Sequence, residues 1–174
     1  RGTRPGPFPI AWRKVRPGGV VPEARECPLL RNAMHIRIIN GPNLDLVGTR
    51  EPAIYGTRTF PDYLRQLQQE YAGHVIDLFQ SNHEGELIEA LRAAEAQCGG
   101  VVLNAGGYSH TSVALRDALA GLKVPVVEVH ISNIHAREEF RHRSLTAVHC
   151  VGVITGFGLE GYRMAVDHLL RRTG

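Results

Sequence analysis

Residues 124–133 read VPVVEVHISN, a run of apolar residues that gives way to polar ones. The segment Val124–Val129 is nearly all apolar, which predicts a strand covered on both faces, as in a parallel sheet. Open parallel sheets bind ligands outside the carboxyl ends of their strands. The polar residues from His130 onward are therefore expected at the functional edge of such a sheet.

The rest of the chain alternates in the same way between strand and helix patterns. Four more strands are predicted at His35–Asn40, Val75–Phe79, Val101–Leu103 and Cys150–Thr155. Helices are predicted at Thr59–Tyr71, Glu84–Ala96, Ser112–Leu122, Ala136–Arg143 and Leu159–Arg171. Five βα units joined by crossovers of helical length predict an α/β fold with a five-stranded parallel sheet between helices. A barrel needs eight such units, so a flavodoxin-like three-layer fold is favoured.

Residues 1–33 differ from the rest of the chain. They hold six of the ten prolines and show neither strand nor helix periodicity. Two interpretations stay open: an appended or upstream-derived segment with Met34 as the natural start, or a natural tail such as an organelle-targeting or interaction peptide. In both, we expect this segment to be disordered and residues 34–174 to form one catalytic domain.

The charge distribution argues against nucleic acid as a partner. The formal net charge is +3, but residues 1–33 hold seven basic and two acidic residues, which leaves 13 basic and 15 acidic residues in the body. A surface that follows phosphates needs clustered positive charge. No apolar run is long enough to span a membrane. Cys27, Cys98 and Cys150 are too far apart for a zinc ribbon and suit a reducing cytoplasm.

Polar side chains gather after four of the predicted strands. They belong to the segments after Asn40, Phe79, Leu103 and Val129, which are rich in asparagine, serine and histidine. The loops at the other edge, around Gly73, Gly99 and Gly121, have few side chains suited to catalysis or ligand binding. This asymmetry predicts one functional edge.

Three other patterns have plainer explanations. Residues 156–161 fit G-x-G-x-x-G, but no further strand follows to complete a ribose site, so a turn with close helix packing is favoured over nucleotide binding. His130, His135 and His142 lack the spacing and acidic partners of a metal site. Ser132 lies near a histidine but has no nucleophile elbow.

The sequence Glu128-Val129-His130 carries more information. Residues two apart in a strand point the same way. A carboxylate placed beside an imidazole fixes its tautomer and can hold it as a general acid or base. A salt bridge at a strand end would account for the pair equally well.

Four separated segments together resemble the type II 3-dehydroquinate dehydratases. They are NGPNLDLVGTREPAIYG (40–56), QSNHEGEL (80–87), LNAGGYSHTSVALRD (103–117) and EVHISNIHAREEFR (128–141). The resemblance covers about residues 35–172 and does not extend to the leading segment. Asp45 stands where many relatives have asparagine, which leaves the reacting groups unchanged.

The resemblance implies a lyase that removes water from 3-dehydroquinate by anti elimination through an enolate, giving 3-dehydroshikimate without metal or cofactor. The other class of dehydroquinase forms a Schiff base on a lysine. This chain has only Lys14, in the leading segment, and Lys123, which precedes the fourth strand at the wrong edge.

The resemblance also implies roles for particular residues. Tyr55 is the base, used as a tyrosinate near Arg50, with Arg137 as further support. His130 is the acid, oriented by Glu128, and Asn43 stabilises the enolate through a water. Substrate binding is implied for Ile131, Ser132, Asn104, His110, Arg141 and, from a neighbouring subunit, Asp117.

Further expectations concern assembly and dynamics. The family assembles as trimers that associate into dodecamers, so a cytoplasmic homo-oligomer is expected. The loop Leu46–Arg58, which carries Arg50 and Tyr55, is expected to close over substrate. Alternatives from other classes stay open. One is a signalling module, although this chain has no acidic cluster after the first strand, and another is a flavin carrier, although the body has no tryptophan to form an aromatic wall. The third is a catalytically inactive relative.

Overall fold

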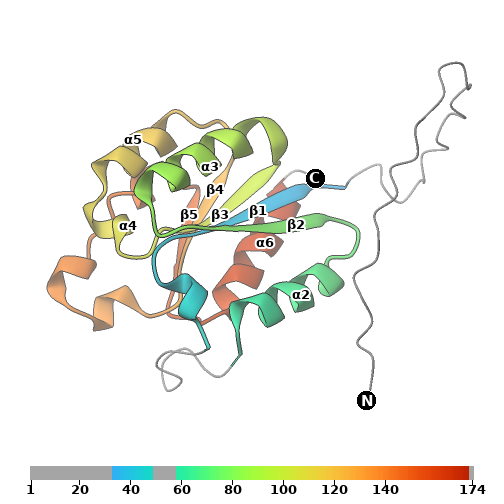
Figure 1. Ribbon diagram of the computed structural model, residues 1–174, viewed down its shortest axis with the longest axis horizontal. Helices are drawn as coiled ribbons and strands as arrows, with labels where there is room; N and C mark the ends of the chain where they lie inside the picture. Colours follow the sequence, from blue (N-terminus) through green and yellow to red (C-terminus); the bar gives the residue numbers. More distant parts are fainter. Residues whose placement is uncertain (1–32, 49–57, 173–174) are drawn as a thin grey trace, which may run out of the picture.

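A computed structural model describes residues 33–48 and 58–172 (Figure 1). In this part of the chain, five parallel strands form one sheet in the order β2-β1-β3-β4-β5. The strands are β1 (His35–Asn40), β2 (Val75–Gln80), β3 (Gly100–Asn104), β4 (Val126–His130) and β5 (Gly152–Thr155). This is the strand order of the flavodoxin-like fold, so the predicted fold class is confirmed.

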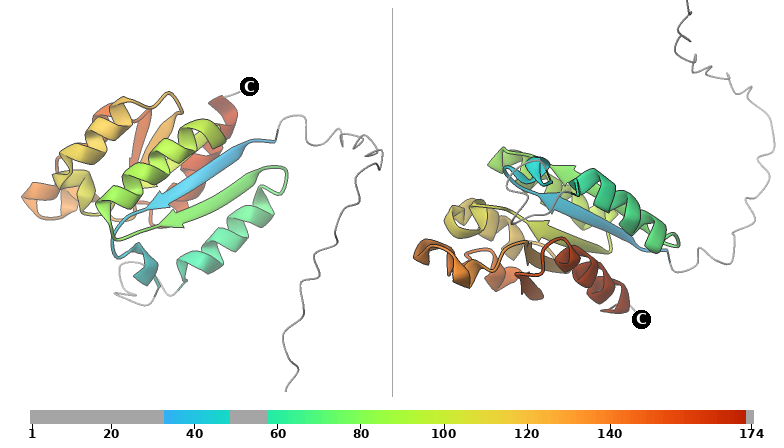
Figure 2. Two further views of the ribbon diagram at one scale, coloured as in Figure 1. Left: turned by 45° about the horizontal axis from the view of Figure 1, so that its top comes forward. Right: turned by 90° about the horizontal axis from the view of Figure 1, so that it is seen from below.

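Helices cover both faces of the sheet (Figure 2). On one face, α2 (Phe60–Glu70) and α6 (Glu160–Arg172) pack on apolar side chains of β1 and β4. On the other, α3 (Glu84–Gln97) and α5 (Val113–Ala120) pack on β3. Every residue of β3 and β4 is buried, which explains why these strands are nearly continuous apolar runs.

Local signals start two of these helices. Thr59 caps α2, because its hydroxyl accepts a hydrogen bond from the backbone amide of Asp62. Pro61 follows within the first turn, where its missing N–H costs nothing. Ser112 caps α5 in the same way, accepting from the amide of Leu115 at 2.8 Å.

The prediction of one helix over Ala136–Arg143 is wrong. Two 3₁₀ turns, Ile134–Ala136 and Glu139–Arg141, occupy this region, and Arg137 between them is extended, with φ −111° and ψ −165°. The side chain of Asn133 accepts the amide of His135 and closes a tight local turn, which competes with a continuous helix. The short helix α4 (Tyr108–Thr111) and the 3₁₀ turns Leu44–Leu46 and Ala147–His149 were not expected either.

An ion pair fastens β1 to β2. Arg37 and Asp77 are direct neighbours across the strands. The guanidinium of Arg37 donates from Nε and Nη2 to the Asp77 carboxylate, with the shortest contact at 2.8 Å. Burial favours the neutral acid, but the hydrogen bonds from Arg37 and His35 outweigh it and hold the pKa of Asp77 below its usual value.

The glycines in the segment after β5 permit a turn with positive φ angles and a close approach of α6 to the sheet. Gly156 and Gly158 have positive φ values of 89° and 60°. A Cβ on Gly161 would lie 3.2 Å from a methyl group of Val129, so α6 approaches the sheet closely there. A turn with close helix packing therefore accounts for all three glycines, as favoured above.

The described residues contain no helix long and apolar enough to cross a membrane. Residues 1–32 of the predicted leading segment, together with Arg50 and Tyr55, lie outside the described residues.

The turns after β1 and β3 touch through their backbones. The amide of Gly41 donates to the carbonyl of Asn104 at 2.7 Å. A Cβ on Gly41 would lie 2.5 Å from the carbonyl oxygen of Ala105, which is backbone and has no free rotation to escape. Only glycine permits this approach.

We expect Gly41→Ala to destabilise the protein by about 2–4 kcal/mol, because the two turns must separate to admit the methyl group. Gly85→Ala is the matched control: Gly85 is exposed in α3, and a Cβ there meets nothing within 4 Å. That control should be neutral or stabilising by up to about 1 kcal/mol. Chemical denaturation of both variants measures the difference, and equal midpoints would contradict the close-approach argument.

Candidate active site

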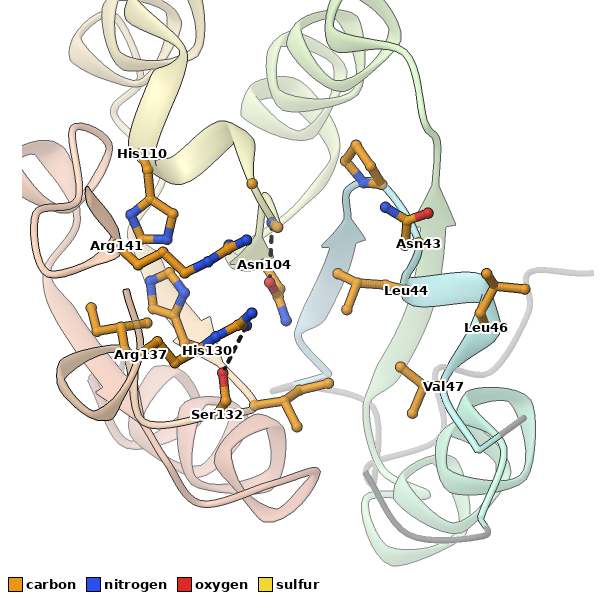
Figure 3. A pocket seen from close by; sticks show the side chains of 15 residues that line it. Asn43, Leu44, Leu46, Val47, Asn104, His110, His130, Ser132, Arg137 and Arg141 are labelled. Carbon is orange, nitrogen blue, oxygen red and sulfur yellow. Dashed lines mark hydrogen bonds between the residues drawn. The ribbon is translucent and has the colours of Figure 1, made fainter. Parts of the chain in front are cut away.

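A cleft of about 320 Å³ opens at the carboxyl edge of the sheet (Figure 3). The segments that follow β1, β3 and β4 form its walls. The predicted site residues that line it are Asn43, Asn104, His110, His130, Ile131, Ser132, Arg137 and Arg141. Leu44, Leu46 and Val47 form an apolar wall opposite the histidines and arginines.

The other predicted site residues lie elsewhere. Glu128 is buried behind His130 and has no exposed surface. Asp117 is exposed on α5 and is not among the residues that line the cleft. Arg50 and Tyr55 are outside the described residues, as is most of the predicted closing loop.

His130 and Glu128 meet at the end of β4. Nε2 of His130 lies 2.6 Å from Oε1 of Glu128, and the imidazole is 5% exposed. Since a carboxylate oxygen accepts, Nε2 carries the proton and Nδ1 is the other nitrogen available for chemistry. The structure thus brings the two side chains together as their spacing in the strand predicts.

The second oxygen of Glu128 also has a donor. The hydroxyl of Thr146 donates to Oε2 at 2.5 Å, and Thr146 is itself fully buried. Burial favours a protonated carboxyl group, but the hydrogen bonds from His130 and Thr146 outweigh it and hold the pKa of Glu128 below its ordinary value. Glu128 therefore presents a carboxylate to His130 at neutral pH.

His110 from α4 stacks on His130. The ring centroids are 5.8 Å apart and the planes are inclined by 23°. Nδ1 of His110 lies 2.9 Å from the carbonyl oxygen of Arg143, which can only accept. Burial lowers the pKa of His110. His110 is therefore a neutral imidazole with its proton on Nδ1, which leaves Nε2 as an acceptor for a ligand hydroxyl.

Two arginines point into the cleft from the 3₁₀ turns after β4 (Figure 3). Arg137 reaches the hydroxyl of Ser132 at 3.4 Å. Arg141 is held from one side by Glu138, with 3.0 Å between Nε and Oε2. Both guanidinium groups line the cleft, so it carries two positive charges on the side that follows β4.

Asn104 is anchored by a buried tyrosine. Its Oδ1 accepts the amide of Gly106 at 3.2 Å, and its Nδ2 donates to the hydroxyl of Tyr162 at 2.8 Å. Tyr162 in turn donates to Oδ1 of Asn40 at 2.9 Å. One amide hydrogen of Asn104 remains for a ligand, and its direction is fixed by this network.

Thr146 and Tyr162 were missed by sequence reasoning. Both lie far along the chain from the residues that they contact, and neither belongs to a motif at a strand end. The one signal was a hydroxyl-bearing side chain on the otherwise apolar buried face of α6, which holds for Tyr162 and has no counterpart at Thr146.

The cleft therefore combines a carboxylate-paired imidazole, two cations and several amide groups. This set can protonate a leaving hydroxyl, bind a carboxylate and orient ring hydroxyls. Among the described residues, no group of three or more His, Cys, Asp or Glu side chains is placed to hold a metal ion.

Glu128 should make stability depend on pH. A pKa lowered in the folded state stabilises the fold above the unfolded-state pKa, and the stabilisation is lost as pH falls through the folded-state pKa. We expect the unfolding free energy of the wild type to fall as pH drops below about 4.5, and that of Glu128→Gln to fall less steeply. Denaturant titrations across this range measure both slopes. Glu89→Gln, an exposed change on α3, should keep the wild-type slope, whereas equal slopes for Glu128→Gln and the wild type would contradict the assignment.

A family model and a protein relative each match most of this chain. The family model described as dehydroquinase class II matches residues 34–170. A Bacillus licheniformis protein named 3-dehydroquinate dehydratase is 55% identical over 138 residues, which cover 78% of this chain and 95% of that protein.

Solved structures agree with the sequence comparison. The type II dehydroquinase from Butyrivibrio crossotus superposes with a TM-score of 0.74 at 46% identity, covering 79% of this chain and 97% of that one. The type II dehydroquinase from Propionibacterium acnes gives a TM-score of 0.76 at 40% identity, covering 80% and 97% of the two chains.

Proposed function

This chain belongs to the class II dehydroquinase family and is a 3-dehydroquinate dehydratase, a hydro-lyase that acts in the shikimate pathway; we propose that the cleft at the carboxyl edge is its active site. The observation that supports the placement most strongly is the His130–Glu128 pair, because it is buried on one side and opens on the cleft on the other.

The reaction converts 3-dehydroquinate into 3-dehydroshikimate and water. A proton leaves the carbon next to the ketone, and the C–H electron pair passes into an enolate. The enolate then forms the new ring C=C bond as the C–O bond to the tertiary hydroxyl breaks. A hydroxyl leaves only after it gains a proton, so the elimination needs both a base and an acid.

We assign the acid to His130. Glu128 stays a carboxylate and accepts the hydrogen bond from Nε2–H, which stabilises the cationic form of the imidazole, and the proton on Nδ1 passes to the departing oxygen. The enolate oxygen needs a donor that acts as the charge develops, and Asn43, on the cleft wall after β1, is proposed for this role through a water.

The base is proposed to be Tyr55, with Arg50 beside it. This assignment rests on the sequence motif, since both residues are outside the described part of the chain. A phenol has an ordinary pKa of about 10, so a tyrosinate requires nearby cations. Arg137 on the cleft wall adds a cation at the site.

The remaining cleft groups are proposed to hold substrate. A carboxylate suits the Ile131 and Ser132 segment after β4. The ring hydroxyls suit the fixed amide of Asn104, Nε2 of His110 and the guanidinium of Arg141. The neutral state of His110 matters here, because an acceptor nitrogen selects a hydroxyl over another acceptor.

We expect His130→Ala to lose at least about a hundredfold in kcat with KM changed little, because protonation assists departure only in the transition state. Turnover is followed by the ultraviolet absorbance of the conjugated product. His135→Ala, which changes a histidine on the adjacent 3₁₀ turn, is the control and should keep near-normal kcat. A fully active His130→Ala enzyme would refute the acid assignment.

We further propose a homo-oligomer, a dodecamer built from trimers, in which Asp117 completes the site of a neighbouring subunit. The exposure of Asp117 on α5, away from its own cleft, supports this arrangement. The free thiols of Cys98 and Cys150 suit a cytoplasmic location, where disulfides are rare.

Mixing inactive variants tests the shared site. Asp117→Ala and His130→Ala are each expected to be impaired, but an unfolded and reassembled equal mixture should regain up to about a quarter of wild-type activity, because some sites then combine an intact histidine with an intact neighbouring aspartate. Sedimentation measures the assembly size in the same samples. If reassembled mixtures recover nothing, or if a monomer is fully active, Asp117 does not act across subunits.

A further inference from the structure

Thr146 is a fully buried hydroxyl side chain that the proposed mechanism does not use. It stands immediately before the 3₁₀ turn Ala147–His149, in the connection that leads to the edge strand β5. It lies sixteen residues beyond His130 and outside the segments that line the cleft. Its hydroxyl nevertheless makes one of the shortest hydrogen bonds to the acid pair.

The contacts of Glu128 define the geometry. Oε1 lies 2.6 Å from Nε2 of His130, and Oε2 lies 2.5 Å from the hydroxyl of Thr146. A carboxylate held at one oxygen can still rotate about its last bond. Held at both oxygens, the carboxylate has a fixed plane, and the direction from which it accepts the hydrogen bond of the imidazole Nε2–H is fixed with it.

We propose that Thr146 is a positioning residue for the dehydration: its hydrogen bond to Oε2 sets the plane of the Glu128 carboxylate and keeps it ionised, and thereby sets the orientation of His130. This inference rests on the proposed role of His130 as the acid. Thr146 touches neither substrate nor the reacting atoms, and it acts through Glu128.

A second hydroxyl supports the first. Thr146 has one hydroxyl hydrogen, which goes to Glu128. Oγ of Ser144 lies 3.1 Å from Oγ1 of Thr146 and 3.4 Å from the carbonyl oxygen of Ser109, so its one hydroxyl hydrogen is placed to be shared between these two acceptors. Ser144 in turn accepts the amide of Ala147 at 3.2 Å, which ties it to the backbone. Such a chain of donors strengthens the terminal bond to the carboxylate.

A purely structural role is the competing explanation. A buried hydroxyl needs a partner wherever it lies, and the loss of that bond would lower stability without affecting the acid. The two roles differ in what else changes. Only a positioning role changes the protonation behaviour of the Glu128–His130 pair and the hydrogen bond between them.

The pH readout depends on the groups around the pair. His110 from α4 stacks on His130, and Arg141 from the 3₁₀ turns after β4 acts on His110. The thiol of Cys150 lies 4.0 Å from Oε2 of Glu128 on the side of Thr146. These groups remain in a Thr146 variant, so a shift in the acid limb of kcat/KM reports on the lost hydroxyl.

The test compares Thr146→Val, which keeps the shape but removes the hydroxyl, with Thr146→Ser, which restores the hydroxyl. Cys150→Ala is the matched control, because it truncates a partly buried side chain beside the same carboxylate and removes only a weak donor at 4.0 Å from Oε2. Each variant is assayed for kcat, KM, the pH dependence of kcat/KM and thermal midpoint. The downfield ¹H resonance of the His130 Nε2 proton is recorded without substrate.

For Thr146→Val we expect kcat to fall by about tenfold with KM within about twofold, as for the loss of one hydrogen bond to a charged group. The acid limb should move to higher pH, because Glu128 is then protonated more easily. The imidazole resonance should move in this variant and stay in place in Cys150→Ala. Thr146→Ser should restore all three properties.

Other outcomes overturn the proposal. A Thr146→Val enzyme with the wild-type acid limb and resonance, whatever its stability, would show that the hydroxyl is only structural. If that variant does not fold, Ser144→Ala replaces it and should move the limb in the same direction by less; an unmoved limb would count against the proposal. The resonance is independent of turnover, so an active His130→Ala enzyme would refute the acid assignment while leaving the coupling of Thr146 to Glu128 measurable.

Discussion

Glu128 holds an ionised carboxylate with no exposed surface, and a charge in that position is tolerated only when its oxygens have donors. One donor is the imidazole that opens on the cleft, and the other is a hydroxyl from the connection to β5. The alternating geometry of β4 places the first donor two residues away on the same face. The second must come from another part of the chain, so the acid pair depends on the tertiary fold as well as on the strand.

The topology of the sheet explains why the cleft lies where it does. The strand order reverses between β1 and β3, and the loops that leave these two strands diverge to opposite faces. The chain after β1 contacts the end of β3 through the hydrogen bond from Gly41 to Asn104, and the cleft opens beyond that contact. The segment after β4 forms the third wall of the cleft. Polar groups that are remote in sequence therefore line one cleft, because each lies on a loop that ends at this edge of the sheet.

Sequence reasoning succeeded where the signal is local. Apolar runs predicted all five strands, and the parallel arrangement predicted the edge at which Asn104 and His130 meet. It failed over 136–143, because the charged pattern there fits a helix, whereas the side chain of Asn133 closes a tighter turn. It also missed Thr146 and Tyr162, whose partners are Glu128 and the amides of Asn40 and Asn104, because only tertiary contacts reveal such residues.

The two edges of the sheet differ in how much change they can absorb. At the amino edge, a Cβ at Gly73 meets nothing within 4 Å, one at Gly121 meets only a carbonyl at 3.6 Å, and one at Gly99 would meet only the flexible side chain of Met34, at 2.7 Å. At the carboxyl edge, Gly41 and Gly106 sit against backbone atoms of the facing turn. The loops around Gly73 and Gly121 can therefore be lengthened without displacing close neighbours of these glycines, whereas insertions at Gly41 or Gly106 would separate the walls of the cleft. A fusion partner or a surface tether belongs at the amino edge for the same reason.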